Sequence, residues 1–156
     1  MNPQSPLPPL TESVAALPSI GTSLKRPECV LATRSGHFYT ADWRGGVAQI
    51  RPDGTETLFT GNMPDGLTAR PNGIALLADG SFLMAQLGET DGGVYHLTRE
   101  GQITPWLRQV DGVDLPPSNF VVQDAAGRTW ITVSTRLAPR AVAYRADVAD
   151  GFIVCV

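Results

Sequence analysis

The chain has 156 residues, a formal net charge of −3 and an aromatic content of 7%. A mildly acidic chain with few aromatic residues offers neither the basic surface that attracts nucleic acid and anionic lipid nor a platform for stacking bases. No run reaches the roughly 18 apolar residues of a membrane span, and the first ten residues lack the features of a secretion signal. We therefore expect a cytoplasmic protein with no nucleic-acid or membrane partner.

The rest of the composition favours an all-β domain. The chain combines 16 glycines and 13 prolines with 42% hydrophobic residues, which indicates many turns between short buried strands and not disorder. The two cysteines, Cys29 and Cys155, are too few and too far apart for a disulfide framework or a zinc motif. We expect both to be buried core residues, because free cysteine is commonly buried.

Residues 1–24 are predicted to form an N-terminal tail. The first nine are rich in proline and polar residues, a composition that is typical of a frayed terminus. Residues 12–24 could supply one closing strand to a sheet formed elsewhere in the chain.

Residues 25–156 contain a repeat. Residues 26–32 (RPECVLA) align with residues 70–76 (RPNGIAL), 44 residues later, and a turn containing glycine follows each. A third copy begins near Pro117. Repeats of this length are typical of the four-stranded blades of a β-propeller. The sequence therefore predicts an all-β partial propeller of three four-stranded blades, at about residues 26–60, 70–108 and 117–156.

Four strands are expected in each copy. Each is a short run rich in β-branched and aromatic residues, bounded by Gly, Asp or Pro. The expected strands are residues 28–33, 37–42, 46–51 and 55–59 in the first copy, 72–77, 81–86, 93–97 and 102–107 in the second, and 119–123, 128–134, 140–145 and 151–155 in the third.

One position is polar in all three copies. Glu28, Asn72 and Asn119 each lie eight residues before the glycine of the first turn in their copy. Because equivalent positions in successive blades point toward one axis, these side chains should meet at one mouth of a central channel. A carboxylate and two amide oxygens are hard ligands that suit Ca²⁺ or Mg²⁺, and less well Zn²⁺ or Mn²⁺. In the alternative interpretation, each residue only satisfies backbone donors at a strand entry.

Three segments, RPECVLATRSGHFYTADWRGGVAQIRPDG, RPNGIALLADGSFLMAQLG and PPSNFVVQDAAGRTWITVS, carry a resemblance to a known family. In order and spacing they resemble the first half of lactonases of the senescence marker protein/gluconolactonase/luciferin-regenerating-enzyme family. The resemblance covers about residues 24–156. It implies half of a six-bladed propeller, in which one divalent cation sits at the top of the central channel.

The resemblance implies roles for the three recurring polar residues. Glu28 matches a metal ligand on the family's first blade, and Asn119 matches a third-blade residue that orients substrate or a metal-bound water. Asn72 lies on the second blade, where the resemblance implies no metal ligand but a role in binding substrate or in supporting the residues that hold the metal. The family's other metal ligands and its catalytic base lie on later blades. The base is therefore expected beyond residue 156, and the chain is expected to be a fragment or a truncated enzyme.

The implied activity is metal-dependent hydrolysis of a small sugar lactone, with Ca²⁺ as the expected cofactor and Zn²⁺, Mn²⁺ or Mg²⁺ as alternatives. The expected partners are the lactone and, because a half propeller leaves apolar sheet faces open, a second half propeller. Two other interpretations stay open, because fold does not determine function. The chain could be a non-enzymatic propeller that binds a partner, or a strictosidine-synthase-like propeller.

Overall fold

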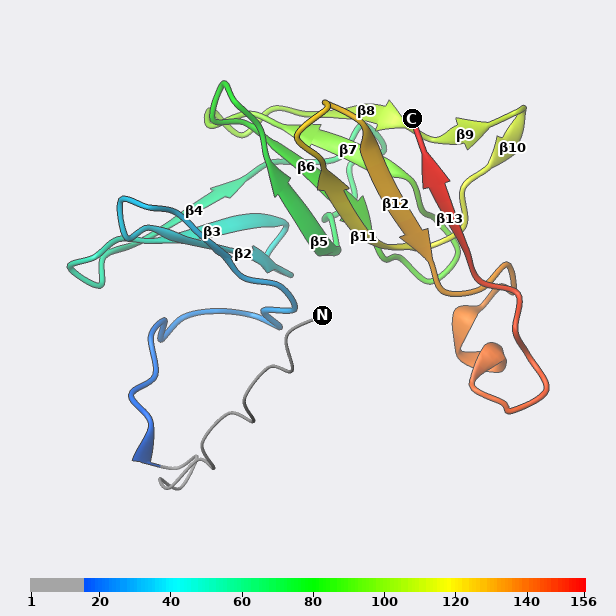
Figure 1. The fold of residues 1–156 in the computed structure, drawn as a ribbon, viewed down its shortest axis with the longest axis horizontal. Helices are drawn as coiled ribbons and strands as arrows, with labels where there is room; N and C mark the ends of the chain where they lie inside the picture. Colours follow the sequence, from blue (N-terminus) through cyan, green and yellow to red (C-terminus); the bar gives the residue numbers. More distant parts are fainter. Residues whose placement is uncertain (1–15) are drawn as a thin grey trace, which may run out of the picture.

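The computed structural model describes residues 16–156, in which nearly all regular structure is β-strand. The strands form antiparallel sheets that follow one another along the chain, from the first sheet at the left of Figure 1 to the third at the right. We call these sheets blades 1, 2 and 3. The predicted all-β, partial-propeller fold class is confirmed. No helix in the described part of the chain is long and apolar enough to cross a membrane.

Blade 1 is a four-stranded sheet whose strands follow the order of the chain. Its strands are short because tight turns separate them, and Gly36 (φ 79°) and Gly54 (φ 83°) supply the positive φ that these turns require. Side chains alternate between the two faces of the sheet, so one face packs on blade 2 and the other points away from it. The strands are β1 (Leu31–Ala32), β2 (Phe38–Asp42), β3 (Gly46–Ile50) and β4 (Glu56–Thr60).

Blade 2 repeats this arrangement in the centre of the structure. Its first strand is irregular, since its pairing with the second strand shifts between Pro71 and Ile74. Such irregularities re-aim side chains at the ends of strands, and this one contains Asn72. The strands are β5 (Pro71–Leu76), β6 (Phe82–Gln86), β7 (Val94–Leu97) and β8 (Ile103–Leu107).

Blade 3 has three strands, β11 (Ser118–Gln123), β12 (Thr129–Val133) and β13 (Phe152–Cys155). The strand predicted at residues 140–145 is wrong, because a 3₁₀ helix, η2 (Arg140–Ala143), lies there in the loop between β12 and β13. Two of its four residues are alanines, which are depleted in strands, and none of the four is buried. This segment therefore has no apolar face that could be paired into the sheet.

A short hairpin, β9 (Gln109–Val110) and β10 (Val113–Asp114), connects blade 2 to blade 3. Asp111 (φ 51°) and Gly112 (φ 77°) form its turn, as is usual for two-residue hairpin loops. No strand was predicted here from the sequence. Of the predicted N-terminal closing strand, residues 16–24 contain no strand, and the rest of that prediction lies outside the described residues.

Two apolar clusters hold the blades together, one between blades 1 and 2 and one between blades 2 and 3. The inner strands of blades 2 and 3 approach closely, because a β-carbon at Gly73 would lie 2.6 Å from the Phe120 Cα atom. Any side chain at position 73 would therefore push these strands apart. The first cluster includes Cys29, Ala41, Val47, Ile74, Phe82 and Leu97, and the second includes Ala75, Leu83, Val94, Val121, Ile131 and Val154.

Arg99 joins blades 1 and 2 at the end of the blades where the β5–β6 and β7–β8 turns lie. Its guanidinium carbon lies 4.6 Å from the ring centroid of Phe59 and 4.9 Å from that of Phe82. Its Nη2 atom donates to the Tyr39 hydroxyl (3.3 Å) and its Nε atom to the carbonyl of Gly80 (2.6 Å). The Arg99 guanidinium thus contacts aromatic rings of both blades. Two of its N–H groups also have hydrogen-bond acceptors.

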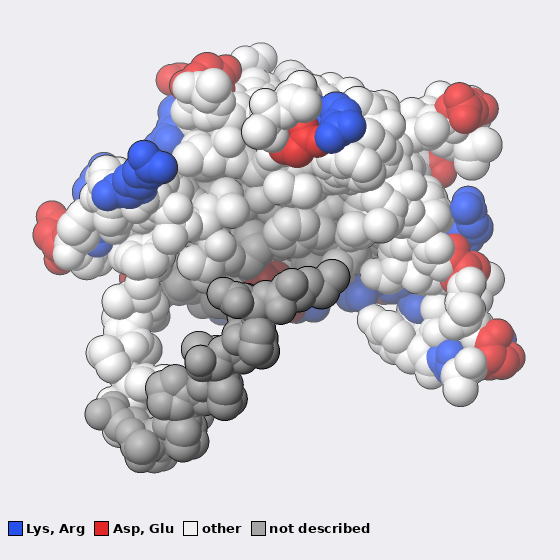
Figure 2. Space-filling model, in the orientation of Figure 1, with Lys and Arg blue, Asp and Glu red and all other residues white. Residues whose placement is uncertain are grey.

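The outward face of blade 3 is open to solvent. Val122, Trp130 and Ile153 share this face and are 46%, 36% and 65% exposed. Cys155 lies beside them and is exposed, so the prediction that both cysteines are buried is wrong for Cys155 and correct for Cys29. The reason is that alternate residues of β13 face away from blade 2. The charged side chains on the side shown in Figure 2 lie in small groups of both signs, separated by uncharged surface.

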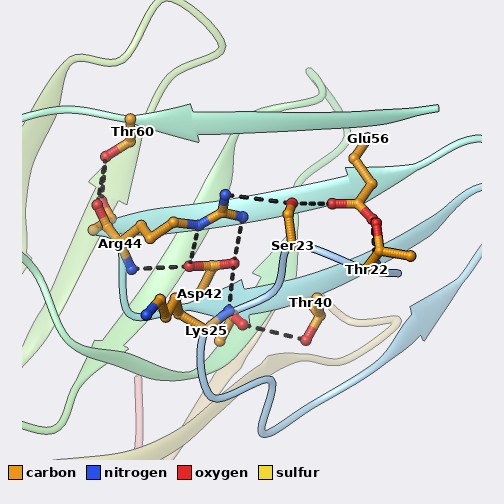
Figure 3. Close-up of polar contacts among 10 residues, drawn as sticks. Thr22, Ser23, Lys25, Thr40, Asp42, Arg44, Glu56 and Thr60 are labelled. Carbon is orange, nitrogen blue, oxygen red and sulfur yellow. Dashed lines mark hydrogen bonds and ion pairs between the residues drawn. The ribbon is translucent and has the colours of Figure 1, made fainter. Parts of the chain in front are cut away.

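The opposite end of the stack is covered by residues 21–25, which we call the N-terminal strap. Ser23 Oγ and the backbone N–H of Thr22 donate to the carboxylate of Glu56 at the start of β4. The backbone N–H of Lys25 donates to Asp42 Oδ2 at the end of β2 (3.1 Å). The strap therefore crosses the outward face of blade 1, where Ile50 is buried (Figure 3).

Asp42 is the anchor of the strap and of the turn that follows β2. Its carboxylate is fully buried and accepts hydrogen bonds from the Arg44 Nε (2.9 Å), Nη2 (2.7 Å) and backbone N–H (2.9 Å) groups, in addition to the one from Lys25. Burial alone would raise the pKa of Asp42, but these hydrogen bonds outweigh it and hold the pKa below its usual value. Because this bond holds the backbone of Lys25, it also fixes the path of the chain just before Glu28.

Replacing Asp42 with Asn is expected to destabilise the fold by about 3 kcal/mol near neutral pH, because Arg44 and two backbone N–H groups lose a charged acceptor. A lowered folded-state pKa means that this stabilisation is present above the ordinary aspartate pKa and is lost as the pH falls through the lowered value. Urea unfolding at about pH 7 and about pH 3 should therefore show a difference between wild type and variant that shrinks in acid.

Asp53→Asn is the matched control for this measurement. Asp53 is an exposed turn residue whose carboxylate accepts the backbone N–H of Thr55 (2.9 Å). Its replacement should cost clearly less than that of Asp42. Equal losses for the two variants would contradict the role given to Asp42.

Candidate functional site

The structure brings Asn72 and Asn119 together. Asn72 lies near the start of β5 and Asn119 near the start of β11, the inner strands of blades 2 and 3. The Asn72 Nδ2 group donates to the backbone carbonyl of Asn119 (3.0 Å) and to its side-chain Oδ1 atom (3.2 Å). The close approach of the two inner strands at Gly73 makes this contact possible. Two of the three predicted site residues therefore share one location.

The other side-chain atom of Asn72 has no partner. The residue is 7% exposed, and its Oδ1 atom is buried without a hydrogen bond from any described residue. A buried acceptor without a donor costs about 1–3 kcal/mol, and such groups are rare in native structures. The two bonds made by Nδ2 hold the amide in this orientation. The site therefore contains one buried amide oxygen of fixed orientation that has no hydrogen-bond donor among the described residues.

Glu28 lies apart from this pair. It precedes β1, it is exposed, and its Oε1 atom forms an ion pair with Arg26 Nη2 at 3.0 Å. Among the described residues, no hydrogen bond links Glu28 to Asn72 or Asn119. Burial raises the pKa of the adjacent Cys29 thiol, which lies against the backbone of Ala41 and Ile74. Glu28 thus stands at the junction of blades 1 and 2, with its carboxylate directed to Arg26.

Two arginine side chains lie near the ring of Trp43, which was not predicted to be near the site. The Arg26 guanidinium lies 3.9 Å from the ring centroid of Trp43, and that of Arg70 lies 5.6 Å from it. The Trp43 Nε1 group donates to the backbone carbonyl of Pro71 (3.1 Å), which directly precedes Asn72. The sequence did contain a signal, because Arg26 and Arg70 occupy the same position in the first two copies of the repeat.

Blade 2 has a recess of about 370 Å³ at the same end as Asn72. The side chain of Gln86 holds two polar groups of this recess in place. The Gln86 Oε1 atom accepts a hydrogen bond from the backbone N–H of Arg70 (2.8 Å), and the Gln86 Nε2 group donates to Asp91 Oδ2 (2.8 Å). Glu89 Oε1 lies 3.7 Å from Arg70 Nη1. Carboxylates and a guanidinium therefore line one small opening. The lining residues are Leu67, Thr68, Arg70, Gln86, Gly88, Glu89 and Asp91.

The oxygen atoms of Glu28 and Asn72 suit a hard divalent cation in kind but not in number. Glu28 offers one carboxylate and Asn72 a free amide oxygen, whereas Ca²⁺ takes six to eight oxygen ligands. Residues 16–156 contain no group of three or more His, Cys, Asp or Glu side chains placed to hold a metal ion. The described residues therefore do not by themselves form a cation site.

Comparison with known proteins gives structural matches and no sequence match. No protein-family model and no curated protein matches the chain. A gluconolactonase from Xanthomonas campestris superposes with a TM-score of 0.56 at 18% identity, covering 78% of this chain and 40% of that protein. A Thermus thermophilus protein named as an oxidoreductase (glucose dehydrogenase) superposes with a TM-score of 0.55 at 14% identity, covering 88% and 45%.

Virginiamycin B lyase from Staphylococcus aureus also matches, with a TM-score of 0.49 at 14% identity over 67% of this chain and 33% of the lyase. That likeness is too weak to support an argument. The chain spans less than half the length of each of these three structures. At such identities the likeness shows the fold alone, which is that of part of a gluconolactonase-like β-propeller.

Proposed function

We propose that this chain provides part of the active site of a metal-dependent hydrolase of small sugar lactones. The observation that carries the proposal is the Asn72–Asn119 pair, which leaves a buried, unpartnered Asn72 Oδ1 atom near the starts of two inner strands. The fold shared with a gluconolactonase supports the choice of substrate class. Both the activity and the substrate belong to the proposal.

Asn72 and Asn119 would act on the substrate side of the site. Asn119 holds the amide of Asn72 through two hydrogen bonds, so the free Oδ1 atom keeps one orientation. A lactone carries several hydroxyl groups, and a hydroxyl donating to this atom would satisfy the buried acceptor. Because the Asn72 amide is already held in one orientation, ligand binding would not cost free energy to reorient it.

The recess in blade 2 would hold the rest of the sugar ring. Arg70, Glu89 and Asp91 offer donors and acceptors that suit the hydroxyl groups of a sugar acid. The fixed amide of Gln86 orders these groups, because it contacts both the Arg70 backbone and the Asp91 carboxylate. Pro71, next to Asn72, pairs with Gln86 of the recess lining, so the recess and the Asn72–Asn119 pair lie at the same end of blade 2.

Glu28 is the residue of this chain that would hold the divalent cation, with Ca²⁺ as the first choice. When bound, such a cation would polarise the lactone carbonyl and lower the pKa of a bound water. Arg26 competes for the same carboxylate in the structure described here. Residues 16–156 do not supply the other ligands or a group placed to accept the proton.

Hydrolysis of a panel of aldonolactones tests the proposal directly. The purified chain is assayed with Ca²⁺, Zn²⁺, Mn²⁺ or Mg²⁺ and with EDTA. We expect metal-dependent turnover, and a loss of about a hundredfold in Glu28→Gln, because one charged ligand is removed. Glu100→Gln is the matched control, since Glu100 is exposed at the opposite end of blade 2. Turnover unaffected by EDTA or by Glu28→Gln would refute the role of Glu28.

Removing the competing arginine should strengthen cation binding. In Arg26→Gln, a positive charge that lies 3.0 Å from the Glu28 carboxylate is lost, so the affinity for Ca²⁺ should rise about fivefold, corresponding to about 1 kcal/mol in a solvent-exposed setting. Calorimetric titration of the chain with Ca²⁺ measures this change. Arg51→Gln makes the same charge change on an exposed residue next to β4 and should leave the affinity unaltered. Equal effects of the two substitutions would mean that the ion does not bind at Glu28.

A further inference from the structure

The ends of the second strands, β2 and β6, hold the chain where it enters blades 1 and 2. In blade 2, the Arg70 N–H group donates to Gln86 Oε1 (2.8 Å), and the Arg70 carbonyl accepts the N–H group of Leu87 (2.9 Å). Pro71, the first residue of β5, follows Arg70 directly. In blade 2, therefore, no residue separates the held position from the proline.

Blade 1 has one additional residue at this place. The Lys25 N–H group donates to Asp42 Oδ2 (3.1 Å), and the Lys25 carbonyl accepts the N–H group of Trp43 (2.9 Å). Arg26 then stands between Lys25 and Pro27. Its φ of 49° lies in the left-handed region, which residues other than glycine rarely adopt. A residue in this conformation persists only where its surroundings hold it, and such residues are concentrated at functional sites.

The indole ring of Trp43 holds the side chain of this additional residue. The guanidinium carbon of Arg26 lies 3.9 Å from the ring centroid. The ring is itself fixed, because the Trp43 Nε1 group donates to the carbonyl of Pro71 (3.1 Å). A guanidinium placed over an aromatic ring has lost much of its conformational freedom and still has N–H groups for an anion. Blades 1 and 2 thus present a positioned guanidinium at their junction.

The charges near Trp43 leave this guanidinium accessible. Among the described residues its ion-pair partner is Glu28, at 3.0 Å, and the two side chains are 38% and 36% exposed. Arg70 brings a second positive charge to 5.6 Å from the same ring centroid, with a contact of 3.7 Å to Glu89, which is 70% exposed. Ion pairs between exposed side chains contribute little free energy. An incoming anion would therefore compete effectively with both carboxylates.

We propose that Arg26, positioned by Trp43, binds the carboxylate of a small hydroxy acid. Guanidinium groups recognise carboxylates through two parallel hydrogen bonds. Addition of water to a lactone breaks the ring C–O bond and gives a hydroxy acid, which near neutral pH is a carboxylate and one released proton. The choice of a hydroxy acid rests on the proposed lactone hydrolysis, whereas the carboxylate site rests on Arg26 and Trp43. Asn72 follows Pro71, whose carbonyl holds Trp43, so this site adjoins the Asn72–Asn119 pair.

Titration of the chain with sodium gluconate in EDTA, followed by NMR at constant ionic strength, tests the proposal without a metal ion and without turnover. We expect saturable shifts of the Arg26 Nε–H and Trp43 Nε1–H signals. Sorbitol has similar hydroxyl groups and no carboxylate, so it should leave both signals unchanged. Propionate has a carboxylate and no hydroxyl group, and it should bind at least about threefold more weakly than gluconate because it lacks hydroxyl contacts.

Substitutions in the chain test the same contacts. Arg26→Gln should weaken gluconate binding about tenfold or more, because charge-assisted hydrogen bonds are lost. Arg26→Lys keeps the charge without the planar fork and should bind with an intermediate affinity. Trp43→Leu should also weaken binding, because the Arg26 guanidinium loses the ring that holds it. Arg51→Gln makes the same charge change at another exposed residue and should bind like the wild type.

Several outcomes would overturn the proposal. These are unshifted signals at about 50 mM gluconate, equal shifts with sorbitol, or an unchanged gluconate affinity in Arg26→Gln. Equal affinities for propionate and gluconate would overturn the assignment of a hydroxy acid. Failure of the proposed hydrolysis is a separate result, because a chain without turnover in any metal would still bind gluconate in EDTA.

Discussion

Every part of this structure depends on the need of a β-sheet to cover its two faces. Blade 2 meets this need with a neighbour on each side, and the two apolar clusters lie at these interfaces. Face-to-face packing also sets the distance between the inner strands, which meet so closely at Gly73 that only glycine fits there. The contact between Asn72 and Asn119 follows from this packing, so the candidate site is a product of how the blades stack.

The polar groups of the molecule divide into two kinds. The carboxylate of Asp42 is completely buried, but four hydrogen bonds satisfy it, and it fixes the strap and the chain that leads to Glu28. Asn72 is nearly as buried, yet its Oδ1 atom has no donor. A satisfied buried group stabilises the fold, whereas an unsatisfied one costs free energy and calls for an explanation. We therefore assign a structural role to Asp42 at the end of β2 and place the candidate site at Asn72.

The sequence predicted the blades because the repeat records the same turns at the same spacing, as at Gly36 and Gly80. It also predicted that Glu28, Asn72 and Asn119 would converge, and of these three the structure brings Asn72 and Asn119 together. It did not reveal that Glu28 pairs with Arg26, because the direction of an exposed side chain depends on its local neighbours. The strand predicted at residues 140–145 was wrong, because the segment forms η2, in which no residue is buried against a sheet.

The N-terminal strap has a consequence for how copies of this protein can associate. The stack of blades has one open end, at the exposed face of blade 3, and one closed end, where residues 21–25 cover blade 1. Contacts that join the end of one copy to the start of the next can continue without limit and build fibres. A copy that approached blade 1 in this way would first have to displace hydrogen bonds to Asp42 and Glu56. Contact with this face of blade 1 would therefore cost the hydrogen bonds that hold residues 21–25 in place.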